Sequence, residues 1–458
     1  MAGINNLLEL SKRALLAYQG AMNTVGHNVA NAQTPGYSRQ RVDLRATGVQ
    51  EGRWYLGLGV RLEAVERVRD RFLEAQILEQ TARWGRFEGQ RALLDRIESL
   101  FVLHSEGSLE AALSRFWSAW SDLAQQPEAM AARLAVREAA LSLQHSFRTY
   151  ARHLNGVREQ AAEQVQEAIA RVNELLRQIA SLNAREYASR LQGVVDNTTL
   201  DERDRLVREL ARYLEVSTQL DPETGMLRLF TGGLWLVEAD KAESLELSLD
   251  STTGTFSLRL RQHQLELQPR QGELAGLREL LNAFLPELRA RLDALAQGLV
   301  STVNVLHASG YTLDNQTGIL FFDPAGTTAA TIQLNSAVLA DPSRIAASDQ
   351  PNEPGNNAVA RAIAGLRTQK LFQAGTQTPG EFAVSLQALV GARARETRAQ
   401  AEQQQAILEH LNTVQDSISG VSLDEEMTHL IRYQQAYAAS AKVLRTVQEM
   451  LETLLSLK

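Results

Sequence analysis

Two stripes of apolar side chains, each with a seven-residue repeat and one near either end, constrain the fold of this 458-residue chain more than any other feature. In the first stripe, apolar residues recur at alternating spacings of four and three, and only Ser11 interrupts them. Its members are Ile4, Leu8, Leu15, Tyr18, Met22, Val25 and Val29. This spacing predicts a helix that buries one face against a partner helix. Thr34-Pro35-Gly36 predicts where the helix ends, because proline and glycine do not continue it.

The second stripe lies between residues 423 and 451 and mirrors the first. Its members are Leu423, Met427, Leu430, Tyr437, Leu444 and Leu451. The companion positions Gln434, Ala441 and Gln448 make this stripe more polar. A single helix cannot bury such a face alone. We therefore predict that the two terminal helices pair as a coiled coil and that the rest of the chain is inserted between them.

Most of the intervening sequence also has the composition and the apolar spacing of helices. The predicted helices cover residues 71–101, 108–125, 129–182 and 396–418. In the last of these, which is otherwise polar, a narrow apolar stripe consists of Ile407, Leu411, Val414 and Ile418.

Residues 216–268 differ, because apolar and polar residues alternate there and turn sequences recur. The pattern D-x-x-T-G occurs three times. At 221–225 and 250–254 it predicts hairpins. At 314–318 it predicts a turn between strands near Tyr311 and at 319–322.

The predicted fold class is mainly α with a smaller β part: an elongated multi-domain rod with paired terminal helices and an inserted β-hairpin domain. The predicted parts are paired terminal helices at 1–45 and 405–458, a helical rod with some β at 46–200 and 272–404, and a small β-rich domain at 201–271.

Composition excludes several classes of function. The chain has no cysteine, which rules out disulfides, thiolate metal sites and cysteine nucleophiles. Its net charge of -7 argues against nucleic acid as a main partner. No early apolar run has the length of a signal peptide or a membrane span, so we expect neither a cleaved leader nor a membrane contact.

Motifs that carry chemistry are missing, and we predict no catalytic residue, no metal site and no cofactor. No two of the eight histidines are three or four residues apart, so a helical zinc pair is excluded. His307, near Asn304, is interpreted as a packed or hydrogen-bonded structural residue. Gly57-Leu58-Gly59 is a fragment of a dinucleotide motif and is interpreted as a turn.

Charged and aromatic clusters have simple structural interpretations. Residues 201–204 (Asp-Glu-Arg-Asp) are interpreted as a charged helix start rather than an acid/base pair. The four arginines of a possible basic strip are interpreted as a solvated helix face. They are Arg133, Arg137, Arg148 and Arg152. Phe116, Trp117 and Trp120 are expected in the core.

The segment that follows the first helix resembles a family signature. Residues 28–37 read N-V-A-N-A-Q-T-P-G-Y and resemble the signature N-A-N-x-x-T-P-G-Y. The residues that carry the resemblance are Asn28, Ala30, Asn31, Thr34, Pro35, Gly36 and Tyr37. Residues 421–426 and 433–437 resemble the matching C-terminal signature. Together they are similar to the bacterial flagellar rod, hook and hook-associated axial proteins. Interior segments at 116–120, 182–183, 201–204, 303–310 and 339–348 are most similar to the hook-associated members.

The resemblance implies a structural subunit of the junction between flagellar hook and filament, which polymerises through its terminal helices. It also implies secretion by type III export to the flagellum. The implied partners are other copies of the chain, the hook protein, a second hook–filament junction protein and a cytoplasmic export chaperone on the C-terminal helix.

Three alternatives stay open from the sequence. The same heptads would serve a cytosolic coiled-coil adaptor, in which residues 28–37 only end a helix. Another rod or hook axial protein would share the signature. An enzyme on a helical scaffold, such as a muralytic domain, is less compatible because the β segment offers no recognisable pair of carboxylates.

Overall fold

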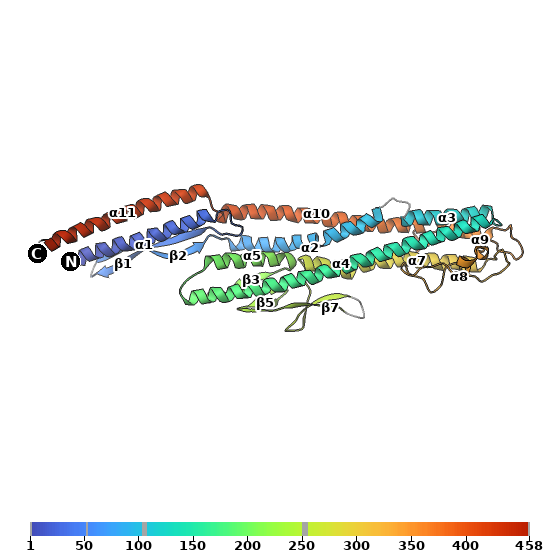
Figure 1. Cartoon of the computed structure of the whole chain (residues 1–458), viewed down its shortest axis with the longest axis horizontal. Helices are drawn as coiled ribbons and strands as arrows, with labels where there is room; N and C mark the ends of the chain where they lie inside the picture. Colours follow the sequence, from blue (N-terminus) through green and yellow to red (C-terminus); the bar gives the residue numbers. More distant parts are fainter. Residues whose placement is uncertain (1, 52–53, 103–107, 250–254, 457–458) are drawn as a thin grey trace. The chain divides into compact units, whose positions relative to one another are not determined.

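The computed structural model describes residues 2–51, 54–102, 108–249 and 255–456, and most of them are helical (Figure 1). The helices are α1 (Ala2–Ala30), α2 (Arg71–Val102), α3 (Leu109–Gln125), α4 (Met130–Leu191), α5 (Asn197–Tyr213), α6 (Glu273–Glu279), α7 (Leu285–Ala308), α8 (Ser336–Ala340), α9 (Ala358–Gly365), α10 (Pro379–Ser419) and α11 (Leu423–Ser456), with a π-helical turn at Leu280–Phe284. The prediction of a mainly α fold with a smaller β part is confirmed. None of the helices within the described ranges combines the length and the apolar character needed to cross a membrane.

Strands form three small antiparallel sheets. The first is a hairpin of β1 (Gln40–Glu51) and β2 (Trp54–Arg67). The second has the order β3 (Ser217–Leu220), β4 (Leu227–Thr231), β5 (Leu234–Glu238) and β6 (Lys241–Ala242). The third has the order β7 (Leu245–Leu249), β8 (Phe256–Leu260) and β9 (Leu265–Leu267).

The chain divides into two compact units, each built from segments that are distant in sequence. Unit 1 consists of Met1–Ala82, Asn173–Ser244 and Gln404–Lys458, and unit 2 consists of Arg83–Val172 and Leu245–Gln403. The second sheet therefore belongs to unit 1 and the third to unit 2. The three-part division expected from the sequence remains a prediction.

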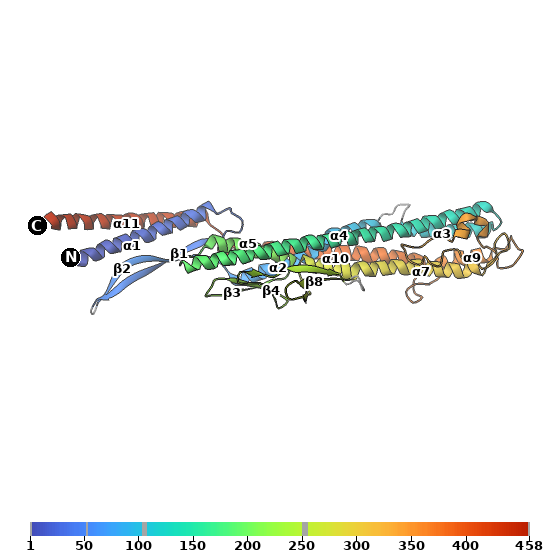
Figure 2. The same cartoon turned by 60° about the horizontal axis from the view of Figure 1, so that its bottom comes forward.

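In unit 1, α1 has two covered faces. One lies along α11, and the ring centroids of Tyr18 and Tyr433 are 6.4 Å apart (Figures 1 and 2). The other lies on the β1–β2 hairpin, where a methyl group at Gly20 would come within 2.7 Å of Leu62 Cδ1. Small buried residues make this close approach possible; they are Ala14, Ala17 and Ala21. Ser11, which interrupts the predicted stripe, is fully buried, and its hydroxyl donates to the Leu7 carbonyl 2.9 Å away.

The interpretation of Gly57-Leu58-Gly59 as a turn is wrong, because these residues lie inside β2. Thr47 pairs with Gly59 and Gly48 pairs with Gly57, so Leu58 is an extra residue and forms a β-bulge. Glycines inside strands commonly mark such bulges and close backbone approaches. Here a Cβ on Gly59 would lie 3.2 Å from Leu10 Cγ of α1. The bulge thus fits the hairpin to the helix.

The three turns predicted from the D-x-x-T-G pattern compare differently with the structure. The first joins β3 to β4 as predicted: the Asp221 carboxylate accepts hydrogen bonds from the Glu223 and Thr224 amides, and Gly225 has a φ of +70°. The second, at 250–254, lies outside the described residues. The third joins no hairpin. Tyr311 instead bridges to Ser348 and Phe322 to Leu334, so the strand prediction there is wrong.

Unit 2 has an aromatic core around His307. Phe116, Trp117 and Trp120 are buried there, as predicted. His307 is fully buried; its Nδ1 lies 2.7 Å from the Ile319 carbonyl and its Nε2 accepts from the Ala346 amide at 2.9 Å. The first contact requires an N–H on Nδ1 and the second a lone pair on Nε2, so the ring is neutral. Burial lowers the pKa of His307 to about 4. The structural interpretation of His307 is confirmed.

The interpretation of the basic strip on α4 as a solvated face is wrong for its first member, Arg133, whereas Arg152 is exposed. Arg133 is 1% exposed, and its guanidinium donates to the carbonyls of Pro127 and Ile345. Arg148 donates to the Ile332 carbonyl at 3.0 Å. These arginines satisfy the carbonyls of Pro127, Ile332 and Ile345, which lie outside the helices and strands.

Candidate functional site

The signature residues form a tight turn at the end of α1. The Asn31 side chain donates to the His27 carbonyl at 2.9 Å, the Thr34 amide donates to the Asn31 carbonyl, and the Tyr37 amide donates to the Thr34 carbonyl at 3.1 Å. Pro35 and Gly36 occupy the bend between them. The turn brings the Tyr37 ring back against His27, with ring centroids 5.5 Å apart.

Asn28 is the centre of the site. Its side chain is 1% exposed and makes four hydrogen bonds. Its Oδ1 accepts from the Tyr37 hydroxyl at 2.7 Å and from the Gln40 amide at 3.0 Å. Its Nδ2 donates to the Gln40 carbonyl at 2.8 Å and to Glu426 Oε2 at 3.0 Å. Every donor and acceptor of this amide is thus satisfied, and one partner is 398 residues away.

Arg39 completes the connection to α11. Its Nε lies 2.8 Å from Glu426 Oε1, and its Nη1 lies 2.6 Å from Glu425 Oε2. Its backbone amide donates to the Ser419 carbonyl at the end of α10. Burial lowers the pKa of Arg39, but hydrogen bonds and charge from Glu425 and Glu426 outweigh this effect and raise it overall. We call Asn28, Tyr37, Arg39, Glu425 and Glu426 the polar joint.

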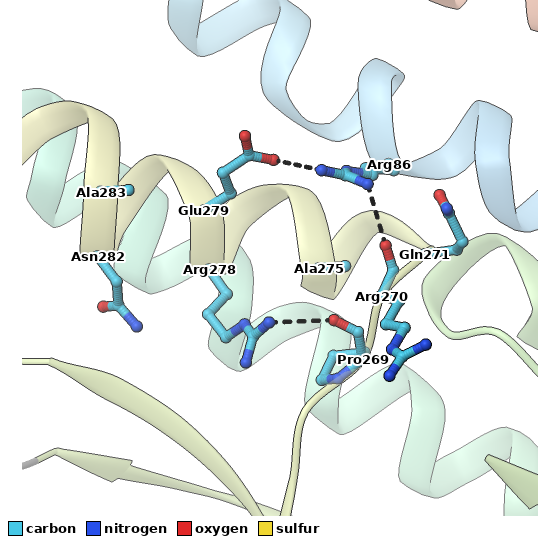
Figure 3. Close-up of a pocket in the computed structure, with 9 residues that line it drawn as sticks. All are labelled: Arg86, Pro269, Arg270, Gln271, Ala275, Arg278, Glu279, Asn282 and Ala283. Atoms are coloured by element: carbon cyan, nitrogen blue, oxygen red, sulfur yellow. Dashed lines mark hydrogen bonds and ion pairs between the residues drawn. The ribbon is translucent and has the colours of Figure 1, made fainter. Parts of the chain in front are cut away.

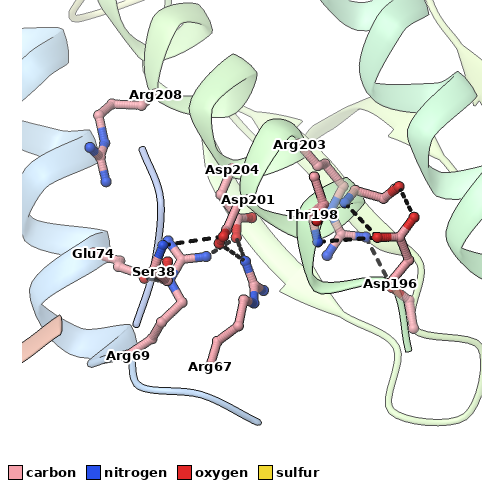
Figure 4. Close-up of polar contacts among 12 residues, drawn as sticks. Ser38, Arg67, Arg69, Glu74, Asp196, Thr198, Asp201, Arg203, Asp204 and Arg208 are labelled. Atoms are coloured by element: carbon pink, nitrogen blue, oxygen red, sulfur yellow. Dashed lines mark hydrogen bonds and ion pairs between the residues drawn. The ribbon is translucent and has the colours of Figure 1, made fainter. Parts of the chain in front are cut away.

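A second charged cluster holds the signature turn onto α5 (Figure 4). The Ser38 amide donates to Asp201 Oδ2 at 3.2 Å. Arg67, at the end of β2, donates to Asp201 Oδ1 and Asp204 Oδ2, both at 2.8 Å. Arg69 also pairs with Asp204. The helix start predicted at 201–204 is correct, since α5 begins at Asn197. Asp201 and Arg203 are buried and Asp204 is paired, whereas Glu202 is exposed.

Burial perturbs several groups around the turn. Burial, together with the nearby Asp201 and Glu426 carboxylates, raises the pKa of the Tyr37 hydroxyl well above its usual value of 10. Burial lowers the pKa of Arg69 and of Arg203 to about 10. Both guanidinium groups remain charged at neutral pH. The chemistry of this region is therefore that of fixed ion pairs and a protonated phenol, not of proton transfer.

The structure places the predicted stripe of α1 mostly against its neighbours. Val25 is buried, and five further members are half-buried; these are Ile4, Leu8, Leu15, Tyr18 and Met22. Val29 is exposed. Of the signature residues, Asn28 is buried and Asn31 and Tyr37 are half-buried, while Ala30, Thr34, Pro35 and Gly36 are exposed.

The predicted stripe of α11 is only partly covered within the chain. Leu430, Leu444 and Leu451 are half-buried. Leu423 and Met427 are 52% and 48% exposed, and Tyr437 is also exposed. Glu426 and Val447 are the buried residues of this helix among those with described side chains. The face of α11 that meets α1 is therefore rotated from the predicted stripe, and part of that stripe faces outward.

The described residues contain no group of three histidine, aspartate or glutamate side chains able to hold a metal ion. In unit 2, both polar and apolar residues line a groove along α6, and three of its charged side chains have partners (Figure 3). There Arg86 pairs with Glu279 at 2.9 Å and Arg278 donates to the Pro269 carbonyl at 3.3 Å.

Comparison with known proteins decides the family. Residues 94–322 match the helical domain of the flagellar hook-associated protein FlgK, and residues 416–457 match the C-terminal region of the flagellar basal body rod FlgEFG proteins. The chain belongs to the FlgK family. The resemblance noted in the sequence is thereby confirmed, and the family places the chain among the structural proteins of the bacterial flagellum.

Full-length FlgK relatives support this assignment. Flagellar hook-associated protein 1 of Bacillus subtilis is 26% identical, with 98% of this chain and 97% of the relative covered. The protein of the same name from Salmonella typhimurium is 24% identical over 99% of this chain and 100% of the relative. The solved structure of the flagellar hook junction protein FlgK from Burkholderia pseudomallei has a TM-score of 0.67 and 14% identity, and the match covers 75% of this chain and all of that one. That likeness shows a shared fold.

The sequence analysis identified the signature residues but not the contacts that they make in the structure. It predicted neither the β1–β2 hairpin nor the contact of Glu426 with Asn28. The hairpin had a signal, because Leu56, Leu58, Val60 and Leu62 alternate with other residues. The polar joint had none, because nothing local relates residue 28 to residue 426.

Proposed function

We propose that this chain is a subunit of the junction between the flagellar hook and the filament, without a catalytic role, and that the α1–α11 pair is the part through which copies join. The polar joint carries the proposal. It ties the family signature to the first turn of α11, so α11 has a fixed position beside α1. A fixed pair of helices presents a defined surface to a neighbouring copy.

The exposed residues of α11 support assembly through this pair. Leu423, Met427 and Ile431 are each about half exposed, although they lie along a helix whose opposite face packs on α1. Apolar side chains grouped on one face usually mark a contact surface. Burial of this face between copies would stabilise the polymer by removing apolar surface from water.

The remaining partners are those that the family resemblance implies. We propose that the hook protein contacts the assembly on one side and a second junction protein on the other. We also propose that a cytoplasmic export chaperone covers the exposed face of α11 before type III export, because that face would otherwise promote premature association. The protein is then secreted to the distal end of the hook.

The central test removes the proposed joining element. Deletion of residues 421–458, in cells that rely on this protein for their flagella, is expected to abolish filament attachment and motility. Sheared flagella of the full-length strain should contain the protein on immunoblots. A truncated chain that still built functional junctions would contradict the proposal.

A point variant separates assembly from folding. Met427→Asp places a charge on an exposed position of α11, so the isolated chain should keep its helix content while junction assembly fails. Val305→Asp is the matched control, because Val305 is a 71% exposed apolar residue on α7 in unit 2. Normal motility of the Met427→Asp strain would be evidence against α11 as the joining surface.

A further inference from the structure

The turn between α10 and α11 contains no contact of its own that fixes the angle between the two helices. It consists of residues 420–422, all of which the structure describes (Figure 1). The Gly420 amide donates to the Asp416 carbonyl of α10, and the Ser422 carbonyl accepts from the Glu426 amide of α11. These hydrogen bonds end one helix and begin the next, and neither joins the two. Since each turn residue has two soft backbone dihedrals, the turn by itself is compatible with several directions of α11.

Arg39 contacts both sides of this turn. Its backbone amide donates at 3.1 Å to the carbonyl of Ser419, the last residue of α10. Its guanidinium bonds to two successive residues in the first turn of α11, with Nε 2.8 Å from Glu426 Oε1 and Nη1 2.6 Å from Glu425 Oε2. One residue thus holds the end of α10 through its backbone and the start of α11 through its side chain.

The backbone of Arg39 is itself held in place by further contacts. Its carbonyl accepts from the amide of Val68, which directly follows β2, at 2.8 Å. The preceding residue, Ser38, is buried, and its amide donates to the Asp201 carboxylate of α5 at 3.2 Å (Figure 4). The side chain of Arg39 therefore extends towards α11 from a point that β2, α5 and α10 fix together.

The contact with α11 is directional as well as electrostatic. A guanidinium is planar, and its N–H groups point in fixed directions, so two carboxylates bound to it have a defined placement. The side chains of Arg39 and Glu426 are 19% and 3% exposed, which limits competition from water. The dipole of α11 disfavours a positive charge at this end of the helix. The two carboxylates offset that effect, so the contact requires both of them.

We propose that the Arg39 side chain sets the direction in which α11 leaves α10. Arg39 is a positioning residue, because it acts on assembly only through the placement of α11. The contact of Asn28 with Glu426 joins α11 to α1, whereas Arg39 also joins α11 to the end of α10. The direction of α11 determines where its exposed residues, such as Met427, face. The consequence for assembly rests on the proposed function, in which that face joins the copies.

The absence of cysteine allows a selective test in the full chain. Gln405→Cys and Gln435→Cys, both at exposed positions, place one spin label on α10 and one on α11. Pulsed electron paramagnetic resonance should give one narrow distribution of the distance between the labels.

Arg39→Gln is expected to broaden this distribution, while circular dichroism shows unchanged helix content. Arg39→Lys should broaden it too, because lysine keeps the charge but not the planar pair of donors. Arg41→Gln is the matched control, since Arg41 is exposed on β1, and it should leave the distribution narrow. A loss of stability alone would not widen the distribution at constant helix content.

Three results would overturn the inference. They are a broad distribution in the labelled chain that keeps Arg39, a narrow one in Arg39→Gln, and equal broadening in Arg41→Gln. A narrow distribution in Arg39→Lys would show that charge alone positions α11, which overturns the role of the guanidinium geometry. Broadening in Arg39→Gln together with normal motility of the Met427→Asp strain would support the role of Arg39 and contradict the proposed function, so the two are tested separately.

Discussion

Each of the two units contains a buried asparagine that hydrogen-bonds to backbone groups. The two asparagines differ in how far along the sequence their partners lie. In unit 2, Asn304 donates to the Phe322 carbonyl at 3.0 Å and accepts from the Phe322 amide at 2.7 Å, 18 residues away. In unit 1, Asn28 also reaches Glu426, 398 residues away. The comparison indicates that the network of unit 2 can form from neighbouring segments. That of unit 1 requires both terminal helices at once.

The largest effect should come from the asparagine with the distant partner. Asn28→Ala removes the hydrogen bonds that Asn28 makes with the Gln40 backbone and with Oε2 of the 2% exposed Glu426, which keeps only its contact with Arg39. We expect a loss of about 3 kcal/mol, confined to unit 1, because unsatisfied buried groups cost this much. Hydrogen exchange should show faster exchange in α1 and α11 and unchanged exchange in α7.

Asn31→Ala is the control for that variant. Asn31 is half-exposed and donates to a carbonyl within its own turn, so its loss should have a much smaller effect. Equal effects of the two substitutions, or faster exchange in both units, would show that the contrast between the units is false.

Unit 2 should respond to acid through His307. Its pKa of about 4 lies below the usual 6.5, so the unfolded chain binds a proton that the folded chain does not. The contribution of His307 to the free energy of unfolding is therefore fully present above pH 6.5 and is lost as the pH drops towards 4. Between pH 6.5 and 5 the loss should be about 2 kcal/mol. Hydrogen exchange of α7 at each pH measures it, and His307→Gln should flatten the difference. An unchanged slope in that variant would exclude His307 as the cause.

The smallest effect should come from the Tyr37 hydroxyl. Tyr37→Phe removes hydrogen bonds to His27 and Asn28 but keeps the ring, so we expect a loss of about 1 kcal/mol in unit 1. The pKa of Tyr37 is raised, so the folded chain retains a proton that the unfolded chain releases above pH 10. Stability should fall as the pH rises beyond 10 in the wild type. A calorimetric titration in which the Phe variant loses stability as steeply would contradict this role.

The sequence predicted the features that depend on local spacing. The terminal helices, the β3–β4 turn and the aromatic core follow from periodicity, turn chemistry and apolar character. The β1–β2 hairpin was missed because Gly57-Leu58-Gly59 was interpreted as a turn, and the role of Gly59 became visible only against Leu10 of α1. The buried state of Arg133 was missed because its carbonyl partners lie at Pro127 and Ile345. Charge alone does not show which arginines have distant acceptors.

The site was predictable only in part, for the same reason. The signature residues were found, and Asn28 and Tyr37 do lie at its centre. Their connection to Arg39 and Glu426 depends on a pairing across nearly the whole chain, for which residue order gives no signal. The outward orientation of Leu423 and Met427 likewise depends on how α11 is rotated against α1.

The Asn28–Glu426 contact also sets an order of events during synthesis. Unit 2 ends at Gln403, so all its residues are available before Glu426 leaves the ribosome. Asn28 is synthesised early, whereas the Glu426 carboxylate that its amide contacts is synthesised nearly 400 residues later. Until then Asn28 can reach only its nearby partners at Tyr37 and Gln40, and α1 lacks its partner helix. The nascent chain therefore carries α1 without its partner helix for most of translation.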